Sequence, residues 1–339
     1  KECDWSSDVC SPIWFRNDII VRGGAPNENV FYLDGIEIPV INHFSTQGSA
    51  GGPQGILNVS FIDEVKLSSS AFDAKFDNAL SSVFEFKQKR GNSDKLQGNI
   101  RMGATEFAST FEGPLSNNGK TTFLVSARRS YLQFLFHLLD LPIRPNYWDY
   151  QFKVTHSIDS KTTLTFLGVG AIDEFSFAAP RNSTPQKIYA LNSSPSINQW
   201  SYTMGMTLKR LIKKGYWNLA LSKNNLYNVN EKYENNLDPN KGEKTFDYNS
   251  NDIGNTLRWD ISKSLLGIKF TTGFNITDIN YDNSTYQLLK YNSLFTNNNP
   301  LQLGTKTYIR YSSSFNYKKY GAFFQMGKRA FNNKLGISA

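Results

Sequence analysis

Apolar and polar side chains alternate along most of the chain from about residue 95 onward. In the run from Trp148 to Thr155, tryptophan, tyrosine, phenylalanine and valine alternate with aspartate, glutamine, lysine and threonine. A period of two sends successive side chains to opposite faces of a β-strand, so this pattern predicts strands with one apolar and one polar face. Similar runs lie at 200–209, 217–224, 253–261 and 268–276.

The predicted strands are long, and their connections alternate between short and long. Many exceed the five or six residues usual in globular proteins and match the roughly 9–11 residues that cross a bilayer at a tilt. Short turns are expected at 116–119, 159–161, 213–215, 264–267 and 332–334, and long loops near 131–146, 173–196, 229–246 and 281–306. Short turns at one end and long loops at the other are typical of outer-membrane β-barrels. The first long loop is expected to hold a short amphipathic helix at 131–139.

Alternation also occurs in soluble β-sandwiches, so a soluble carbohydrate-binding sandwich is one alternative. Strand length, aromatic residues near the strand ends and the unequal connections favour the membrane barrel. Residues 93–339 are expected to supply about nine or ten strands. Because an open sheet edge cannot face hydrocarbon, a barrel of this kind must close, and we expect these strands to be only its first part.

Residues 14–92 differ from the rest, because strand-like runs are separated by glycine-rich turns. Four segments stand out in order: IVRGG at 20–24, FYLDGI at 31–36, FIDEV at 61–65 and AFDAKFDNALSSV at 71–83. Together they resemble the plug domain of TonB-dependent outer-membrane receptors. The amino-acid sequence of residues 28–44 is most similar to receptors of Bacteroidetes type. One departure is Ser68-Ser69-Ser70, where many members have Arg-Gly-Pro, so one usual plug–barrel arginine contact is expected to be missing.

The resemblance implies a mainly all-β protein: a partial transmembrane antiparallel β-barrel at 93–339, preceded by the later part of a small mixed α/β plug at 14–92. It implies TonB-dependent import of a scarce nutrient across the Gram-negative outer membrane, with an iron chelate, cobalamin or an oligosaccharide as ligand. The partners would be TonB, through a TonB box that is absent from the present sequence, and outer-membrane lipid. A passive barrel or adhesin is the other alternative, although it would lack the plug.

The resemblance also indicates candidate binding residues, but no enzymatic activity and no cofactor. The loop after the LDG hairpin would face the ligand; its members are Asn42, His43, Phe44, Ser45, Thr46 and Gln47. Arg22 matches the arginine of the plug motif and would pair with carboxylates of the barrel. Arg128 and Arg129, on a predicted strand, could face either the lumen or the outer rim.

Composition adds little to this picture. The net charge of +8 comes from lysines and arginines spread singly along the chain, which gives no reason to expect nucleic acid as a partner. The three histidines, His43, His137 and His156, have no histidine or cysteine at metal-binding spacing. Both cysteines lie in 1–13, a segment that resembles the translation of a DNA sequencing adaptor, and we exclude it from the fold.

Overall fold

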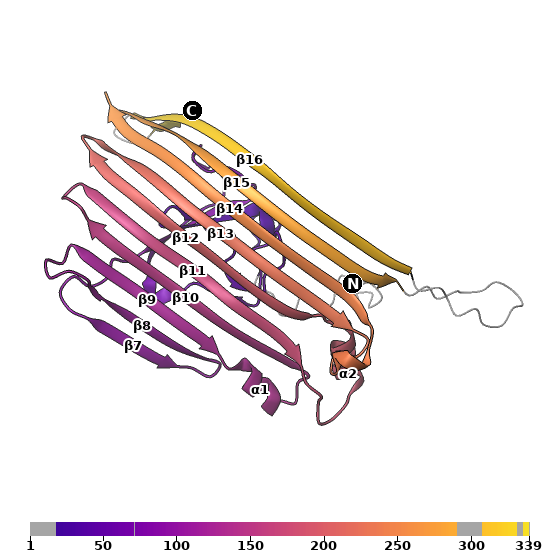
Figure 1. The fold of residues 1–339 in the computed structure, drawn as a ribbon. Coiled ribbons are helices and arrows are strands. Elements are labelled where there is room, and N and C mark those ends of the chain that lie inside the picture. The colour runs from indigo at the N-terminus through magenta and orange to yellow at the C-terminus, as the bar shows by residue number, and fades with distance from the viewer. Residues whose placement is uncertain (1–17, 71, 290–306, 331–334, 339) are drawn as a thin grey trace, which may run out of the picture.

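The computed structural model describes residues 18–70, 72–289, 307–330 and 335–338. These residues form a small N-terminal domain, the plug, which lies against one face of a large antiparallel sheet, the barrel wall (Figure 1). Residues 1–13, the expected adaptor segment with both cysteines, lie outside the described residues. Among those described, no helix is both long enough and apolar enough to cross a bilayer.

The barrel wall is a meander in which each strand pairs with the next in sequence. Within the described residues it has eleven strands, so the expected count of nine or ten was too low. In chain order they are β7 (Gln97–Met102), β8 (Glu106–Pro114), β9 (Thr121–Ser130), β10 (Ile143–Ser157), β11 (Thr162–Phe177), β12 (Ser196–Ile212), β13 (Gly215–Tyr233), β14 (Lys244–Leu265), β15 (Ile268–Leu289), β16 (Thr307–Ala330) and β17 (Leu335–Ser338).

The connections alternate in length as expected, but the strands run further into the predicted loops. The turns expected at 116–119 and 159–161 fall between paired strands, and those expected at 213–215 and 264–267 shrink to 213–214 and 266–267; 332–334 lies outside the described residues. The loops expected near 131–146, 173–196, 229–246 and 281–306 each lose residues to flanking strands. The parts that remain helical are α1 (Leu132–Leu138), within the helix expected at 131–139, α2 (Pro185–Ser193) and the 3-10 helix η5 (Pro239–Lys241).

On the wall, one face buries polar side chains and the other exposes apolar ones, which is the opposite of a soluble sandwich. On β10 the polar side chains of Asp149, Gln151 and Lys153 are at most 8% exposed, whereas Trp148 is 42% exposed. We call the face that carries the buried polar side chains the inner face, and its opposite the outer face. On the outer face an apolar row crosses five strands, formed by Phe166, Met206, Leu221, Leu257 and Ile276. An exposed apolar band of this kind is suited to lipid.

The plug is built on a four-stranded sheet in the order β2-β1-β6-β5. Its strands are β1 (Asn29–Leu33), β2 (Ile36–Glu37), β5 (Ile62–Ser68) and β6 (Ser82–Gln88), with β1 and β6 parallel. The hairpin β3 (Asn42–His43) and β4 (Gln54–Gly55) and the 3-10 helices η3 (Pro26–Glu28) and η4 (Val59–Phe61) complete it. Asp34 and Gly35 have φ of 49° and 87°, which confirms the predicted tight turn at this dipeptide.

A compact apolar cluster fixes the plug sheet to the wall. Phe31, Leu33 and Ile36 pack in one cluster with buried side chains of β11, which include Leu167 and Val169. Gly205 of β12 allows this approach, because a Cβ atom there would lie 2.7 Å from Cγ1 of Ile36. Polar contacts join other parts of the plug to the wall, and they contain the candidate site.

Candidate functional site

His43 of the plug is enclosed by two aspartates from neighbouring wall strands. Its Nδ1 lies 2.5 Å from Oδ1 of Asp173 on β11, and its Nε2 lies 3.0 Å from Oδ2 of Asp149 on β10. The ring stacks on Tyr147 at a centroid distance of 4.0 Å and is fully buried. Because both ring nitrogens face carboxylates, both donate, and the ring is an imidazolium.

Two opposed effects set the charge of His43. Burial alone would lower its pKa, but the hydrogen bonds to Asp149 and Asp173 outweigh burial, and the pKa is raised above its ordinary value. The backbone N–H of Phe44 also donates to Asp173, at 2.8 Å. The hairpin β3–β4 is therefore held to the wall by charged hydrogen bonds in a dry environment.

Arg128 extends this network across the wall and back to the plug. Its Nε donates to Asp149 at 2.6 Å, and its Nη1 lies 3.3 Å from Oε2 of Glu106 on β8. The same guanidinium donates to the carbonyl of Gly55 in the plug. We call the group formed by His43, Arg128, Glu106, Asp149 and Asp173 the charged anchor. Its members on β8, β9 and β11 lie towards the long-loop ends of those strands, and the group joins the plug to β8, β9, β10 and β11.

A separate ion pair lies nearer the short-turn end. Lys153 of β10 lies 2.9 Å from Oδ2 of Asp34 in the plug turn, and its ammonium also donates to the carbonyl of Gln88 at 3.0 Å. Both charged side chains are mostly buried. The plug turn predicted from Asp34-Gly35 thus meets a wall cation directly.

The loop predicted to bind ligand is mostly engaged with the wall. Asn42 and Ser45 are buried, and Gln199 of β12 donates to the carbonyl of Ser45 at 3.1 Å. Gln47 donates to Asp252 at 3.1 Å and accepts from Asn228 at 2.9 Å. These contacts assign His43, Ser45 and Gln47 to plug–wall contact, whereas Asn42 donates to the carbonyl of Ala50 within the plug at 2.7 Å. Phe44 is half-buried and Thr46 is exposed at the long-loop side. Ligand contact stays a prediction.

Of the three arginines singled out in the sequence, only Arg22 was expected to join the plug to the barrel, and the sides that Arg128 and Arg129 face were left open. Arg22 is exposed, with φ of 52°, and forms no ion pair with any residue that the structure describes. Its predicted role stays a prediction, while Arg128 and Lys153 provide cations at the interface. Arg129 lies on the outer face, with its guanidinium 4.6 Å from the ring centroid of Trp148, which settles the open orientation of Arg128 and Arg129.

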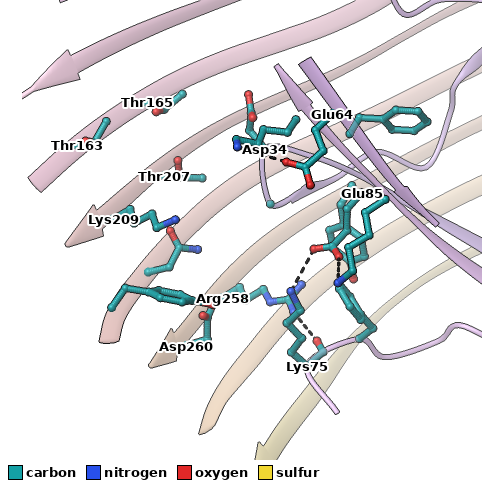
Figure 2. Close-up of a pocket in the computed structure, with 18 of the residues that line it drawn as sticks. Asp34, Glu64, Lys75, Glu85, Thr163, Thr165, Thr207, Lys209, Arg258 and Asp260 are labelled. Carbon is teal, nitrogen blue, oxygen red and sulfur yellow. Dashed lines mark hydrogen bonds and ion pairs between the residues drawn. The ribbon is translucent and has the colours of Figure 1, made fainter. Parts of the chain in front are cut away.

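A charged cavity of about 470 Å³ separates plug and wall near the short turns (Figure 2). Lys75 and Glu85 form an ion pair at 3.1 Å on the plug side. Arg258 of β14 reaches across, donates to the carbonyl of Lys75 and lies 5.2 Å from the ring centroid of Tyr32. Thr163, Thr165, Thr207 and Lys209 line the wall side. A polar cavity of this size is suited to hold water.

A second cavity, of about 390 Å³, lies next to Gln47 between the plug and β13–β16. Glu37, Asp77, Asp252 and Lys319 contribute to its lining. Burial and the neighbouring charge of Asp77 raise the pKa of Glu37 to about 7, against the opposing effect of Arg258 and Lys319. This carboxyl is therefore poised to change charge near neutral pH.

Beyond the plug, the inner face of β14–β16 forms an aromatic surface that the sequence analysis missed. Tyr281 and Phe315 have ring centroids 5.1 Å apart, and Phe315 and Tyr317 lie 5.9 Å apart. These side chains share the inner face with Ile279 and Lys319, which line the second cavity. We call this surface, Tyr281, Phe315 and Tyr317, the vestibule. It lies at the long-loop end of the sheet.

The vestibule was hidden because 281–306 was predicted to be a loop. On the outer face of the same strand segment, Asn280, Asp282 and Ser284 replace the apolar residues of the lower rows, and alternation fades. The backbone pairing of β15 nevertheless continues to Leu289. Spaced aromatic residues at 281, 286, 308, 311, 315 and 317 were the available signal.

Among the residues that the structure describes, no group of three histidine, cysteine or acidic side chains is arranged so that it could hold a metal ion. No protein-family model matches the chain, and no curated protein matches it.

Solved structures, in contrast, show the same fold. The chain aligns with the ferripyoverdine receptor of the outer membrane of Pseudomonas aeruginosa at a TM-score of 0.61 and 15% identity, covering 94% of this chain and 45% of that one. For the copper transporter OprC the TM-score is 0.61 at 9% identity, covering 92% and 45%. For a variant of the ferric enterobactin receptor PfeA from Pseudomonas aeruginosa it is 0.53 at 12% identity, covering 89% and 53%.

The chain thus spans about half the length of the structures it resembles. The shared part includes both the plug and the wall strands, because the alignments cover nearly all of this chain. The chain therefore has the fold of the plug and adjoining barrel wall of TonB-dependent outer-membrane receptors.

Proposed function

We propose that this chain is part of a TonB-dependent importer that carries a scarce nutrient across the outer membrane of a Gram-negative bacterium. The observation that carries the proposal is the polar inner face of the wall, which holds a plug through buried charges while the apolar outer face stays exposed. A passive barrel has no need for such a plug. A soluble carbohydrate-binding sandwich would bury its apolar faces instead.

The ends of the strands orient the molecule in the membrane. Short turns of outer-membrane barrels face the periplasm, and longer loops face outward. By this rule the vestibule opens to the outside, the charged anchor lies in the outward half of the wall, and the charged cavity faces the periplasm. A ligand arriving from outside meets the aromatic surface first and then the exposed part of the loop at Phe44 and Thr46.

Transport of this kind needs no covalent chemistry, so the protein's task is to hold and then release the plug. The periplasmic part of the interface borders the charged cavity, so its groups would exchange protein partners for water at low cost when they separate. The charged anchor is dry, and separating it leaves buried charges without partners. A pull by TonB from the periplasmic side would therefore loosen the periplasmic part first, while the anchor resists until last.

The vestibule supports an organic ligand with flat or hydrophobic faces, because aromatic rings stack on such faces. We keep an iron chelate, cobalamin and an oligosaccharide as the candidate classes. Each stacking contact contributes about 0.5–1.5 kcal/mol, so removal of one ring should weaken binding by roughly two- to tenfold.

Uptake measurements test the proposal. Cells that express the complete receptor containing this chain are supplied with each labelled candidate nutrient, in a strain with TonB and in one without it. We expect saturable uptake of one class that stops without TonB or after a protonophore. Uptake that continues without TonB would overturn the proposal in favour of a passive barrel.

The vestibule provides a matched pair of variants for the same assay. Tyr281→Ala removes a ring from the inner face, and Tyr320→Ala removes one from the outer face, where it is 73% exposed. We expect a higher KM with Tyr281→Ala and unchanged uptake with Tyr320→Ala. Equal effects of the two changes would remove the vestibule from the ligand path.

A further inference from the structure

Glu37 of the plug is an acidic side chain without a direct partner. It ends β2, is mostly buried, and lines the second cavity together with Asp77 of the plug and Lys319 of the wall. Its carboxyl group forms neither an ion pair nor a hydrogen bond with any residue that the structure describes. Because removing a charge from water is costly without a partner, the charge of this group depends on its surroundings.

The two wall cations near Glu37 are engaged with other groups. Arg258 of β14 donates to the carbonyl of Lys75, and its guanidinium packs against aromatic rings of the plug. The ammonium of Lys319, on β16, lies 5.5 Å from the ring centroid of Tyr317 in the vestibule. The charges of both cations act on Glu37 through space, but neither forms an ion pair with it.

The other carboxyl groups of the second cavity are held by amide groups. Asp77 accepts from Nδ2 of Asn275 on β15 at 2.5 Å, and Asp252 of β14 accepts from Gln47 at 3.1 Å. Tyr32 of β1, which pairs with the position of the acid on β2, is a further titratable neighbour. β12 and β13 also pack against β2, and within the described chain no charged residue of either strand lines the cavity. Asp77 is therefore the negative charge that acts on the unpaired acid.

Two plug carboxylates in one cavity repel each other when both are charged. Burial and the charge of Asp77 raise the pKa of Glu37 to about 7, and Arg258 and Lys319 oppose this rise. Below neutral pH, Glu37 is neutral and the plug contributes the charge of Asp77 alone. Above neutral pH, two like charges share a space of about 390 Å³, where they interact more strongly than in bulk water.

This repulsion acts on the plug segment 72–80, which precedes β6 and contains Asp77. The segment contacts the wall at Arg258 of β14 (Figure 2), at Asn275 of β15, and at β16, where the backbone N–H of Ala74 donates to Oε1 of Gln325 at 3.1 Å. We call the contact between segment 72–80 and strands β14–β16 the seam. Its wall partners bind backbone groups or a single carboxylate, so an added charge can loosen the seam while the charged anchor holds.

The second cavity lies where the outside pH can act on it. Ile279 and Lys319 line the cavity and share the inner face of the wall with the vestibule. In the proposed orientation the vestibule opens to the outside, so protons reach the cavity from that side. Glu37 therefore responds to the medium rather than to the periplasm.

We propose that Glu37 is a proton-controlled switch of the seam. A neutral Glu37 lets segment 72–80 stay seated against β14–β16, whereas a charged Glu37 repels Asp77 and loosens the segment. Import would then increase as the outside pH rises through neutrality. This last step rests on the proposed function, but the switch itself concerns the plug and needs neither ligand nor TonB.

Urea unfolding of the complete receptor containing this chain, in lipid vesicles at a series of pH values, tests the switch. An acid whose pKa is higher in the folded protein stabilises the fold at low pH, and this contribution is lost as pH rises from the ordinary value of 4.5 to about 7. We expect the unfolding equilibrium constant to increase by about tenfold or more across this window. Glu37→Gln should lose this dependence, whereas Glu64→Gln, whose side chain is 60% exposed, should keep it. The difference between the profiles separates Glu37 from His43.

Hydrogen exchange then locates the effect in the molecule. After correction for the intrinsic exchange rate at each pH, protection of segment 72–80 should fall above neutral pH in the unmodified protein and stay constant in Glu37→Gln. Any change at the charged anchor should be the same in both proteins. If Glu37→Gln does not fold, Asp77→Asn removes the repelling charge and should move the transition to lower pH. Equal pH profiles for the unmodified protein and Glu37→Gln, or an equal effect of Glu64→Gln, would overturn the proposal.

Uptake by cells separates the switch from the proposed import. Initial rates are measured below and above neutral pH, and the ratio of the variant to the unmodified receptor cancels the effect of pH on the energy supply. We expect uptake to increase with pH for the unmodified receptor relative to Glu37→Gln. A constant ratio would refute control of import by Glu37. If neither receptor imports at any pH but the seam still responds to pH, the proposed function fails and the switch stands.

Discussion

The inner and outer faces of the barrel wall are made by the same strands yet follow opposite rules. On β10, Asp149 is 3% exposed and engaged by two cations, whereas its neighbour Trp148 is 42% exposed. In a soluble protein the tryptophan would be buried and the aspartate solvated. The polar side chains of the inner face are buried because the plug covers them. The apolar side chains of the outer face suit the surroundings of the wall.

The two faces therefore derive their stability from different terms. The inner face depends on charged groups that are paired after losing their water, and such pairs are sensitive to the loss of one partner. The outer face depends on apolar contact with its surroundings, and it is sensitive to the introduction of charge. Substitutions on each face should therefore have distinct signatures.

The largest effect is expected from Asp149→Ala, which removes the shared partner of His43 and Arg128. Two cations would remain in a site from which water is largely excluded, and breaking a buried pair of this kind costs about 3–5 kcal/mol. Urea unfolding in lipid vesicles measures the change. Ile172→Ala, on the outer face, is the control and should cost less. A loss below that of the control would show that the charged anchor does not hold the plug.

The next largest effect is expected from Met206→Arg in the apolar row of the outer face. Met206 is 41% exposed, so in a soluble protein this change would cost little. Against lipid, a central arginine costs about 2–4 kcal/mol. The same vesicle assay measures it, with Met206→Leu as the volume-matched control. If arginine and leucine were equally tolerated, the outer face would not be a lipid face.

Sequence alone predicted the part of the wall where the two faces differ most. Where lipid requires one apolar face, alternation is clear, and the strands around Trp148 and Leu257 were predicted correctly. Where β15 extends past Ile276, the outer residues Asn280 and Asp282 are polar, so no alternation reveals the strand. Strand pairing persists there because backbone hydrogen bonds do not depend on the polarity of side chains.

The candidate site was less accessible to sequence reasoning, because its partners are distant in the chain. His43 was singled out, but Asp149 and Asp173 lie 106 and 130 residues away, and nothing local links them. Arg128 was a different case. Val125 is exposed on the outer face, and Arg129, four residues on, shares that face, so Arg128 faces inward. Period-two alternation starting from the apolar Val125 could have assigned the two arginines to opposite faces.

A smaller effect is expected from pH acting on the charged anchor. His43 has a raised pKa in the folded protein, so its protonated form contributes stability below the unfolded pKa. This contribution is lost as pH rises through the folded pKa, because Asp149 and Asp173 then face a neutral ring. The thermal midpoint should therefore fall towards alkaline pH, and less steeply with His43→Gln. Identical pH profiles for the two proteins would contradict the imidazolium assignment.

The smallest effect is expected where the plug carries ion pairs that water can reach. Lys66 lies 3.1 Å from Glu85, but its side chain is 54% exposed, unlike the cations of the charged anchor. Exposed pairs contribute about 0–1 kcal/mol, because water screens them and ordering two long side chains costs entropy. Lys66→Ala should therefore change urea stability by less than this amount, and the difference should vanish at high salt. A loss comparable to that of Asp149→Ala would show that the periplasmic side of the plug is as dry as the charged anchor, and the order of release proposed for the plug would then be wrong.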